Sequence, residues 1–207
     1  SVVRVETDMG VGTGFIFEMS EWDSTGDGSA LVLTDHSVVK GADTIEVLVK
    51  DVGTLPAEVQ GLDKKRGLAV LRICCGEFTP LVMEANTAPE PGDPVFAMGH
   101  KQGSSGSSSP DPGLITAFQS PEGIGLILTD IELIPGFSGG PLLSTGGQVL
   151  GINISDPEDT FRESAGEPGS FAISAWSLTS LIPRMLAKGD KGSERATKTD
   201  NESRSES

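Results

Sequence analysis

Short runs of apolar residues, separated by Gly, Pro, Asp and Ser, recur about every ten residues along most of the chain. Runs of this length closed by turn-forming residues are typical of the strands of antiparallel barrels and sandwiches. We count about twelve such runs. They centre on residues 2–5, 14–17, 30–33, 45–49, 57–60 and 68–73, and then on 95–98, 114–118, 125–128, 141–143, 149–154 and 170–173.

A proline-rich segment divides these runs into two equal sets. Pro80, Pro89 and Pro91 lie in residues 79–93 and would interrupt any hydrogen-bonded ladder. Six runs precede the segment and six follow it. The sequence therefore predicts an all-β fold of two six-stranded antiparallel barrels, the N-terminal one at about 1–78 and the C-terminal one at about 92–175.

Near the end of the chain the spacing of apolar residues changes from that of strands to that of a helix. Apolar residues there have helical spacing, at Leu178, Leu181, Ile182, Met185 and Leu186. A short helix over about 180–187, with Ser180 as its N-cap, would place Pro183 in the first turn, where its missing N–H does no harm. Residues 188–207 contain almost no large apolar side chain, so we expect a disordered tail or linker there.

Composition narrows the possible partners. The 207 residues carry a formal charge of -15, which argues against nucleic acid, because phosphate binding needs clustered Lys and Arg. The acidity lies in residues 1–187 and could attract cationic peptides. No apolar stretch is long enough to span a membrane and the start has no signal-peptide pattern, so we expect a soluble or excised domain.

The only cysteines, Cys74 and Cys75, are adjacent and cannot close a long loop. We expect reduced, partly buried thiols rather than a redox or metal site, since no other cysteine is present to complete one. Few cysteines slightly favour a reducing intracellular compartment but do not require it, so localisation stays open. We expect neither a metal nor a cofactor.

The run Gly136–Pro141 suggests nucleophilic chemistry. Acyl transfer to a serine needs a hydroxyl on a tight turn, N–H groups aimed at the developing oxyanion, and a base within reach. The glycines around Ser138 permit such a turn, and the N–H groups of Gly136 and Ser138 are the candidate oxyanion hole. The base must be His36 or His100, the only histidines.

The surroundings of His36 resemble those in HtrA/Deg proteases. Thr34-Asp35-His36-Ser37-Val38-Val39, then Gly41-Ala42 and the strand Leu68–Ile73, look like the family's first barrel. Gly12–Ile16 resembles its opening strand, residues 129–142 its nucleophile segment, and Gly151–Asn153 and Phe171–Ile173 its cleft strands. The resemblance implies a trypsin-like protease domain over about 1–187, with Ser138 as nucleophile and His36 as general base. It gives His100 no catalytic role, and we expect a loop histidine there.

The resemblance fails at one position. The carboxylate that orients the catalytic histidine should stand immediately before the Leu68 strand, where this sequence has Gly67. Asp63 could substitute if its turn were rebuilt. Asp35 adjoins His36, but successive side chains diverge, so this pair is a weaker possibility. Water or a carbonyl could also hold the ring.

Further residues bear on substrate binding and on the oxyanion hole. Phe137 replaces the small polar residue usual before the nucleophile, and it either packs in the core or distorts the hole. Glu132 falls where trypsin-like folds have the base of the primary specificity pocket, so it either selects Lys and Arg or is simply solvated. A substrate strand is expected to pair with an edge at Gly151, Ile152 and Asn153.

These observations predict a serine endopeptidase of HtrA/Deg type that cleaves exposed polypeptide, with a His36–Ser138 dyad and low activity. The alternative is a catalytically impaired pseudoprotease that binds peptides or a partner protein. A purely structural barrel would leave the pairing of His36 with Ser138 unexplained. The family often forms trimers, but the sequence gives no basis for deciding assembly, substrate preference, or whether a PDZ domain follows in a longer chain.

Overall fold

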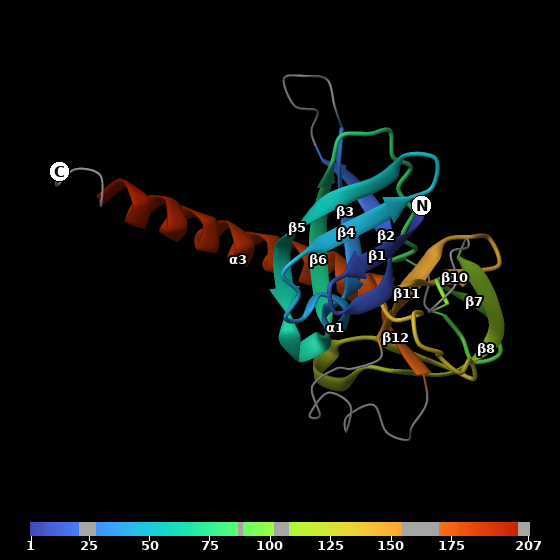
Figure 1. Cartoon of the computed structure of the whole chain (residues 1–207). Helices are drawn as coiled ribbons and strands as arrows, with labels where there is room; N and C mark the ends of the chain where they lie inside the picture. Colours follow the sequence, from blue (N-terminus) through green and yellow to red (C-terminus); the bar gives the residue numbers. More distant parts are fainter. Residues whose placement is uncertain (21–27, 87–88, 102–107, 155–169, 203–207) are drawn as a thin grey trace.

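The computed structural model describes the chain except residues 21–27, 87–88, 102–107, 155–169 and 203–207. Its strands form two closed antiparallel barrels, and a C-terminal helix leads from the second barrel across the first (Figure 1). Each barrel has six strands, so the fold predicted from the alternation of apolar runs and turns is confirmed.

The N-terminal barrel closes in the order β1-β2-β3-β6-β5-β4. A four-residue helix, α1 (His36–Val39), follows β3, and a 3-10 turn, η1 (Lys64–Arg66), joins β5 to β6. The strands are β1 (Val2–Thr7), β2 (Gly10–Ser20), β3 (Ser29–Asp35), β4 (Ile45–Val49), β5 (Gly53–Asp63) and β6 (Leu68–Cys74).

The C-terminal barrel closes in the order β10-β11-β12-β9-β8-β7. A 3-10 turn, η2 (Pro121–Gly123), lies between β8 and β9. The strands are β7 (Pro94–Gly99), β8 (Ser109–Gln119), β9 (Leu126–Thr129), β10 (Pro141–Ser144), β11 (Val149–Ile154) and β12 (Ser170–Ser174). Each of the twelve predicted runs overlaps one of the twelve strands.

Buried Val, Ile, Leu and Phe fill both barrels. Each barrel has its own cluster, and a third cluster joins residues of β2, β3 and β6 that face out of the first barrel to residues of β11, β12 and the final helix. Because burying apolar area is the main favourable term in folding, this shared cluster holds the two barrels together. The junction between barrels, where the candidate site lies, is therefore part of the core.

The final helix, α3 (Ala175–Glu202), is longer than predicted and starts earlier. Ser174 acts as its cap, because the Ser177 N–H donates to the Ser174 Oγ at 3.4 Å, so the expected cap at Ser180 is wrong. Pro183 consequently lies inside the helix rather than in its first turn. The expected tail from residue 188 is helical as far as Glu202, and 203–207 lie outside the described residues.

α3 packs against the N-terminal barrel at β5. A Cβ added to Gly61 of β5 would lie 2.8 Å from the backbone carbonyl carbon of Met185 in α3. The inward face of α3 is apolar and buried at Leu178, Leu181 and Ile182. A helix that begins in one barrel is thus anchored on the other.

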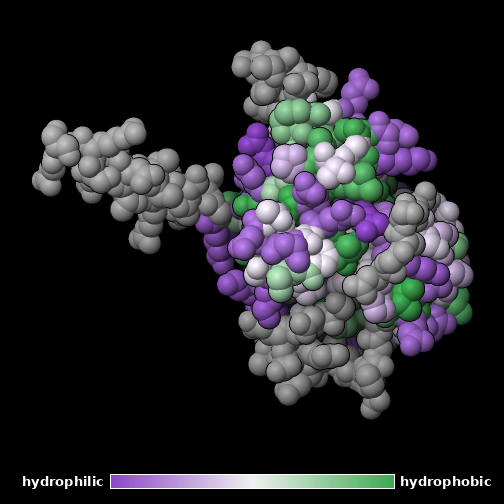
Figure 2. All heavy atoms as spheres, viewed as in Figure 1, coloured by the Kyte–Doolittle hydropathy of each residue, from purple (hydrophilic) through white to green (hydrophobic). Residues whose placement is uncertain are grey.

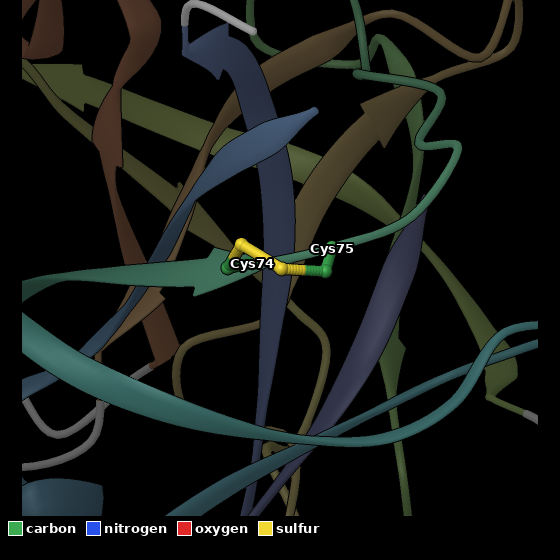
Figure 3. Close-up of a disulfide and its surroundings, with 2 residues drawn as sticks. All are labelled: Cys74 and Cys75. Carbon is green, nitrogen blue, oxygen red and sulfur yellow. A yellow bond between two sulfur atoms is a disulfide. The ribbon is translucent and has the colours of Figure 1, made fainter. Parts of the chain in front are cut away.

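Cys74 and Cys75 form a disulfide between adjacent residues at the end of β6 (Figure 3). Cys75 has a φ of 84°, a left-handed conformation that turns the chain out of the strand. The expectation of reduced thiols is therefore wrong, and it fails because adjacency forbids only a long closed loop, not a bond between neighbours.

Hydrophilic residues cover much of the molecular face in Figure 2, with smaller hydrophobic areas between them. Among the described residues, no helix combines the length and apolar character needed to cross a bilayer.

Candidate active site

Ser138 lies on a tight turn that leads into β10. The Phe137 carbonyl accepts a hydrogen bond from the Gly140 N–H at 3.0 Å, and Gly139 has a φ of 82°. Gly139 also donates its N–H to the Asn153 carbonyl of β11 at 2.8 Å. The sequence forms this turn here because glycine adopts the left-handed conformation without a Cβ clash.

The N-terminal barrel contacts the same turn from the other side. The Thr13 N–H of β2 donates to the Ser138 carbonyl at 3.1 Å. A Cβ on Gly139 would overlap the Thr13 carbonyl oxygen and would lie 2.5 Å from the Thr34 hydroxyl. Ser138 is therefore presented at the junction of the two barrels, by residues of both.

The Asp35 side chain contacts the Ser138 hydroxyl. Ser138 Oγ donates a short hydrogen bond to Asp35 Oδ2. Asp35 is fully buried at the end of β3, and its other oxygen accepts the Ser37 N–H at 2.7 Å as the cap of α1. Because a serine hydroxyl carries one proton, this proton is committed to a carboxylate in this structure.

His36 follows Asp35 and is the first residue of α1. Its backbone N–H donates to the Gly67 carbonyl at 2.9 Å, so the structure brings together the two positions at which the sequence predicted a histidine and its acid. Gly67 caps η1 with φ 72° and ψ 31°, and it contributes no side chain. The position at which the sequence predicted the acid therefore lies beside His36 and supplies no carboxylate.

Asp63, the predicted substitute, is engaged within its own turn. Its Oδ2 forms a salt bridge with Arg66 Nη1 at 2.7 Å, and its Oδ1 accepts the Arg66 N–H at 3.2 Å. Both oxygens therefore have partners in η1. The sequence offered Asp35 as a weaker possibility for holding the His36 ring, and in the structure Asp35 accepts a hydrogen bond from Ser138.

The candidate oxyanion hole lies at Gly136 and Ser138. Gly136 has a φ of 99°, and its carbonyl accepts the Thr13 hydroxyl at 2.6 Å, which fixes the peptide plane that follows it. Among the described residues no backbone acceptor is found for the Gly136 N–H. Phe137 is 1% exposed in the core of the C-terminal barrel, against Gly99, so its packing role is confirmed.

His100 lies in the loop that directly follows β7, as expected, and it is buried at the barrel junction. Its N–H donates to Thr13 Oγ1 at 2.9 Å, and its Nδ1 lies 3.3 Å from the same oxygen. Burial, and next the positive charge of Arg4, lower the pKa of His100 below its usual range. His100 thus ties β7 to β2 beside the site.

The predicted substrate strand is not a free edge. β11 pairs with β10 on one side and β12 on the other, and Asn153 exchanges backbone bonds with Gly139 and Gly140. Strand addition at Gly151–Asn153 is therefore excluded by barrel closure. The Asn153 side chain is 3% exposed, and its Nδ2 has no acceptor among the described residues. Glu132 is exposed on the loop before the turn that carries Ser138.

No cluster of three metal-ligating side chains occurs in the described part of the chain. The groups available for chemistry are a serine hydroxyl, a buried carboxylate, two histidines and backbone N–H donors. Such a set suits acyl transfer to a serine.

Comparison with known proteins agrees with this chemistry. A family model described as a trypsin-like peptidase domain matches residues 12–152. The serine protease Do-like HtrA of Bacillus subtilis is 29% identical over 194 residues, covering 89% of this chain and 41% of that protein. A chloroplastic Do-like protease of Arabidopsis thaliana is 31% identical over 161 residues, covering 73% of this chain and 34% of that protein.

A solved structure shows the same architecture. The serine endoprotease from Yersinia pestis superposes with a TM-score of 0.73 at 26% identity, covering 91% of this chain and 63% of that one. The chain spans about two fifths of the length of the curated relatives it matches.

Proposed function

Because this chain belongs to the family of trypsin-like peptidase domains, we propose that it is a serine endopeptidase of HtrA/Deg type that cleaves exposed polypeptide segments with low turnover. The observation that carries the proposal is the position of Ser138, on a glycine-rich turn held by both barrels at their junction. The net charge of -15 favours substrates with cationic segments.

In the proposed reaction Ser138 Oγ attacks the scissile carbonyl, and its proton passes to His36. The N–H groups of Gly136 and Ser138 stabilise the tetrahedral oxyanion. His36 then returns the proton to the leaving amine, and water hydrolyses the acyl-enzyme by the same steps. The Ser138 side chain must first rotate away from Asp35, because its proton cannot be given to two acceptors at once.

Two features make turnover low. First, the hydroxyl donates to a carboxylate in the resting state, and a hydrogen bond to a charged group is worth about 1.5–3 kcal/mol. Second, Gly67 has no carboxylate to hold the imidazole tautomer, and in a serine protease triad the exchange of that acid for an amide lowers turnover by about 10⁴. Residual catalysis by the remaining groups is still measurable.

A serine-directed fluorophosphonate tests the proposal directly. We expect slow labelling of the folded protein at Ser138 and none of Ser138→Ala, with the labelled peptide identified by mass spectrometry. Ser144→Ala, a change on β10 away from the turn, is the matched control and keeps the label. Folded protein that takes up no label over hours would overturn the proposal.

The bond from Ser138 to Asp35 favours a second candidate, a pseudoprotease that binds extended peptides without hydrolysing them. In that case fluorescence polarisation would detect binding of a casein-derived peptide that is neither cleaved nor competed by the fluorophosphonate. Labelling of Ser138 together with peptide cleavage rejects this candidate.

A further inference from the structure

A basic pocket lies between η1 and α3, at the end of the N-terminal barrel where β5 turns into β6. It has a volume of about 370 Å³. Five of the chain's 15 Lys and Arg side chains line it, against one carboxylate, Asp63; the five are Lys64, Lys65, Arg66, Arg184 and Lys188. In a chain with a formal charge of -15, such a concentration of positive charge stands apart.

Internal partners neutralise only part of this charge. Asp63 binds Arg66 at 2.7 Å, and Lys65 binds Glu122 of η2 at 2.8 Å. The hydrogen bond from Lys65 holds the pKa of Glu122 below its usual range, so that pair stays charged at neutral pH. Lys64, Arg184 and Lys188 have no carboxylate within ion-pair distance in the described part of the chain.

The arrangement of positive charges in the pocket is unfavourable by itself. Arg184 and Lys188 stand four residues apart on α3, where like charges repel, and both line the same pocket as the consecutive cations of η1. The Nε of Arg66 is buried and has no acceptor among the described residues. An unsatisfied buried donor and clustered like charges are both relieved by one kind of ligand, an anion.

We propose that this pocket binds a small polyanion that carries two or more phosphoryl or carboxylate groups. Arginine guanidinium groups donate in pairs to both kinds of oxyanion, and Arg66 and Arg184 line the pocket from its two walls, η1 and α3. The volume is at the small end of ligand sites, which suits a compact ligand rather than a macromolecule. Hydrophilic residues cover the edge of the molecule from which α3 emerges (Figure 2).

The apolar lining of the pocket adds to the effect of its charges. Leu62, Leu181 and Met185 also line it, and Leu181 and Met185 are buried. Low-polarity surroundings strengthen charge interactions, because water screens them less. The pocket therefore lies between two elements, over the buried side chains of Leu181 and Met185, with Lys64, Arg184 and Lys188 exposed to solvent.

Isothermal titration of inorganic pyrophosphate into the protein, at constant ionic strength, tests the proposal. We expect saturable one-to-one binding, weakened at least tenfold in the double variant Arg184→Gln/Lys188→Gln. The control is Lys50→Gln/Arg72→Gln, which removes one exposed Lys and one exposed Arg elsewhere and leaves affinity within twofold. Circular dichroism confirms that each variant is folded.

Citrate in place of pyrophosphate separates the two ligand chemistries. Binding of pyrophosphate at least tenfold tighter than citrate assigns the pocket to phosphoryl groups, and comparable binding assigns it to polyanions of either kind. No saturable binding above a chloride blank, or equal affinity in the pocket variant and the control, overturns the proposal. The measurement does not depend on proteolysis, so it stands or fails separately from the proposed function.

Discussion

The two barrels have the same number of strands but differ in what they bring to the site. The C-terminal barrel supplies Ser138 on a turn held by backbone hydrogen bonds, with Phe137 packed in the core beside it. The N-terminal barrel should supply a base and an acid. It presents Asp35 to the Ser138 hydroxyl, His36 one residue later, and Gly67 where the acid is expected.

This difference separates the turn that carries Ser138, the proposed nucleophile, from the side chains proposed as base and acid. The turn depends on main-chain packing between barrels, so Ser138 is positioned whether or not a base is present. The base and acid depend on individual side chains, which can be exchanged without disturbing the fold. A trypsin-like domain can therefore keep its nucleophile geometry while its catalytic power changes.

We expect the largest effect on stability from adding a methyl group to the turn that carries Ser138. Gly139→Ala places a Cβ onto the Thr13 carbonyl oxygen at a φ of 82°, so we expect a loss of about 3 kcal/mol or more in the free energy of unfolding. Gly147→Ala has a similar φ of 78° but open space, and should cost only about 1 kcal/mol. Urea denaturation measures both; equal losses would show that barrel contact at Gly139 is unimportant.

Restoring the acid tests the N-terminal half. In Gly67→Asp we expect casein hydrolysis to rise on the order of 10²-fold, because a carboxylate beside His36 stabilises the imidazolium. Asp tolerates the left-handed conformation of Gly67 better than most residues. Gly67→Asn has the same tolerance without the charge and is the control. A gain shared by both variants, or by neither, would reject the missing acid as the limit on turnover.

In the proposed reaction Asp35 competes with His36 for the proton of the Ser138 hydroxyl. Asp35→Asn keeps an oxygen for the cap of α1 but weakens the bond to Ser138 by about 1 kcal/mol, so labelling by fluorophosphonate should rise about fivefold. Asp8→Asn alters another carboxylate that accepts backbone N–H bonds in the same barrel, and it should leave the rate unchanged. Slower labelling of Asp35→Asn would instead make Asp35 the base.

The smallest effect we predict is on the pH dependence of stability, through His100, which connects β7 to β2 by its hydrogen bond to Thr13. Because burial lowers the folded-state pKa of His100 below the unfolded value of 6.5, the unfolded chain binds the proton more readily. Stability should therefore be complete above about pH 7 and fall as the pH drops through about 6.5 toward the folded pKa, by up to about 1.4 kcal/mol per pH unit. His100→Gln should lack this component in denaturant titrations across that range; an unchanged pH profile would contradict it.

Most of the fold was predictable because its signals are local. Runs of Val, Ile and Leu between turn residues placed all twelve strands, and three prolines placed the division between barrels. The end of the chain was not predictable in this way. Ser174 caps α3 by a bond to the Ser177 N–H, and a cap at the end of a strand looks in sequence like any other serine. The disulfide of Cys74 and Cys75 likewise depended on a backbone turn at Cys75.

Residue identity and order were enough to establish that Ser138 stands in a glycine-rich run, that Gly67 brings no carboxylate, and that the family is trypsin-like. The side chain that meets the Ser138 hydroxyl depended on tertiary packing. The contact of β3 with the turn that carries Ser138 places the buried Asp35 carboxylate within hydrogen-bond distance of the Ser138 hydroxyl. Barrel closure likewise removed the edge expected at β11, since a strand bonded on both sides cannot accept another.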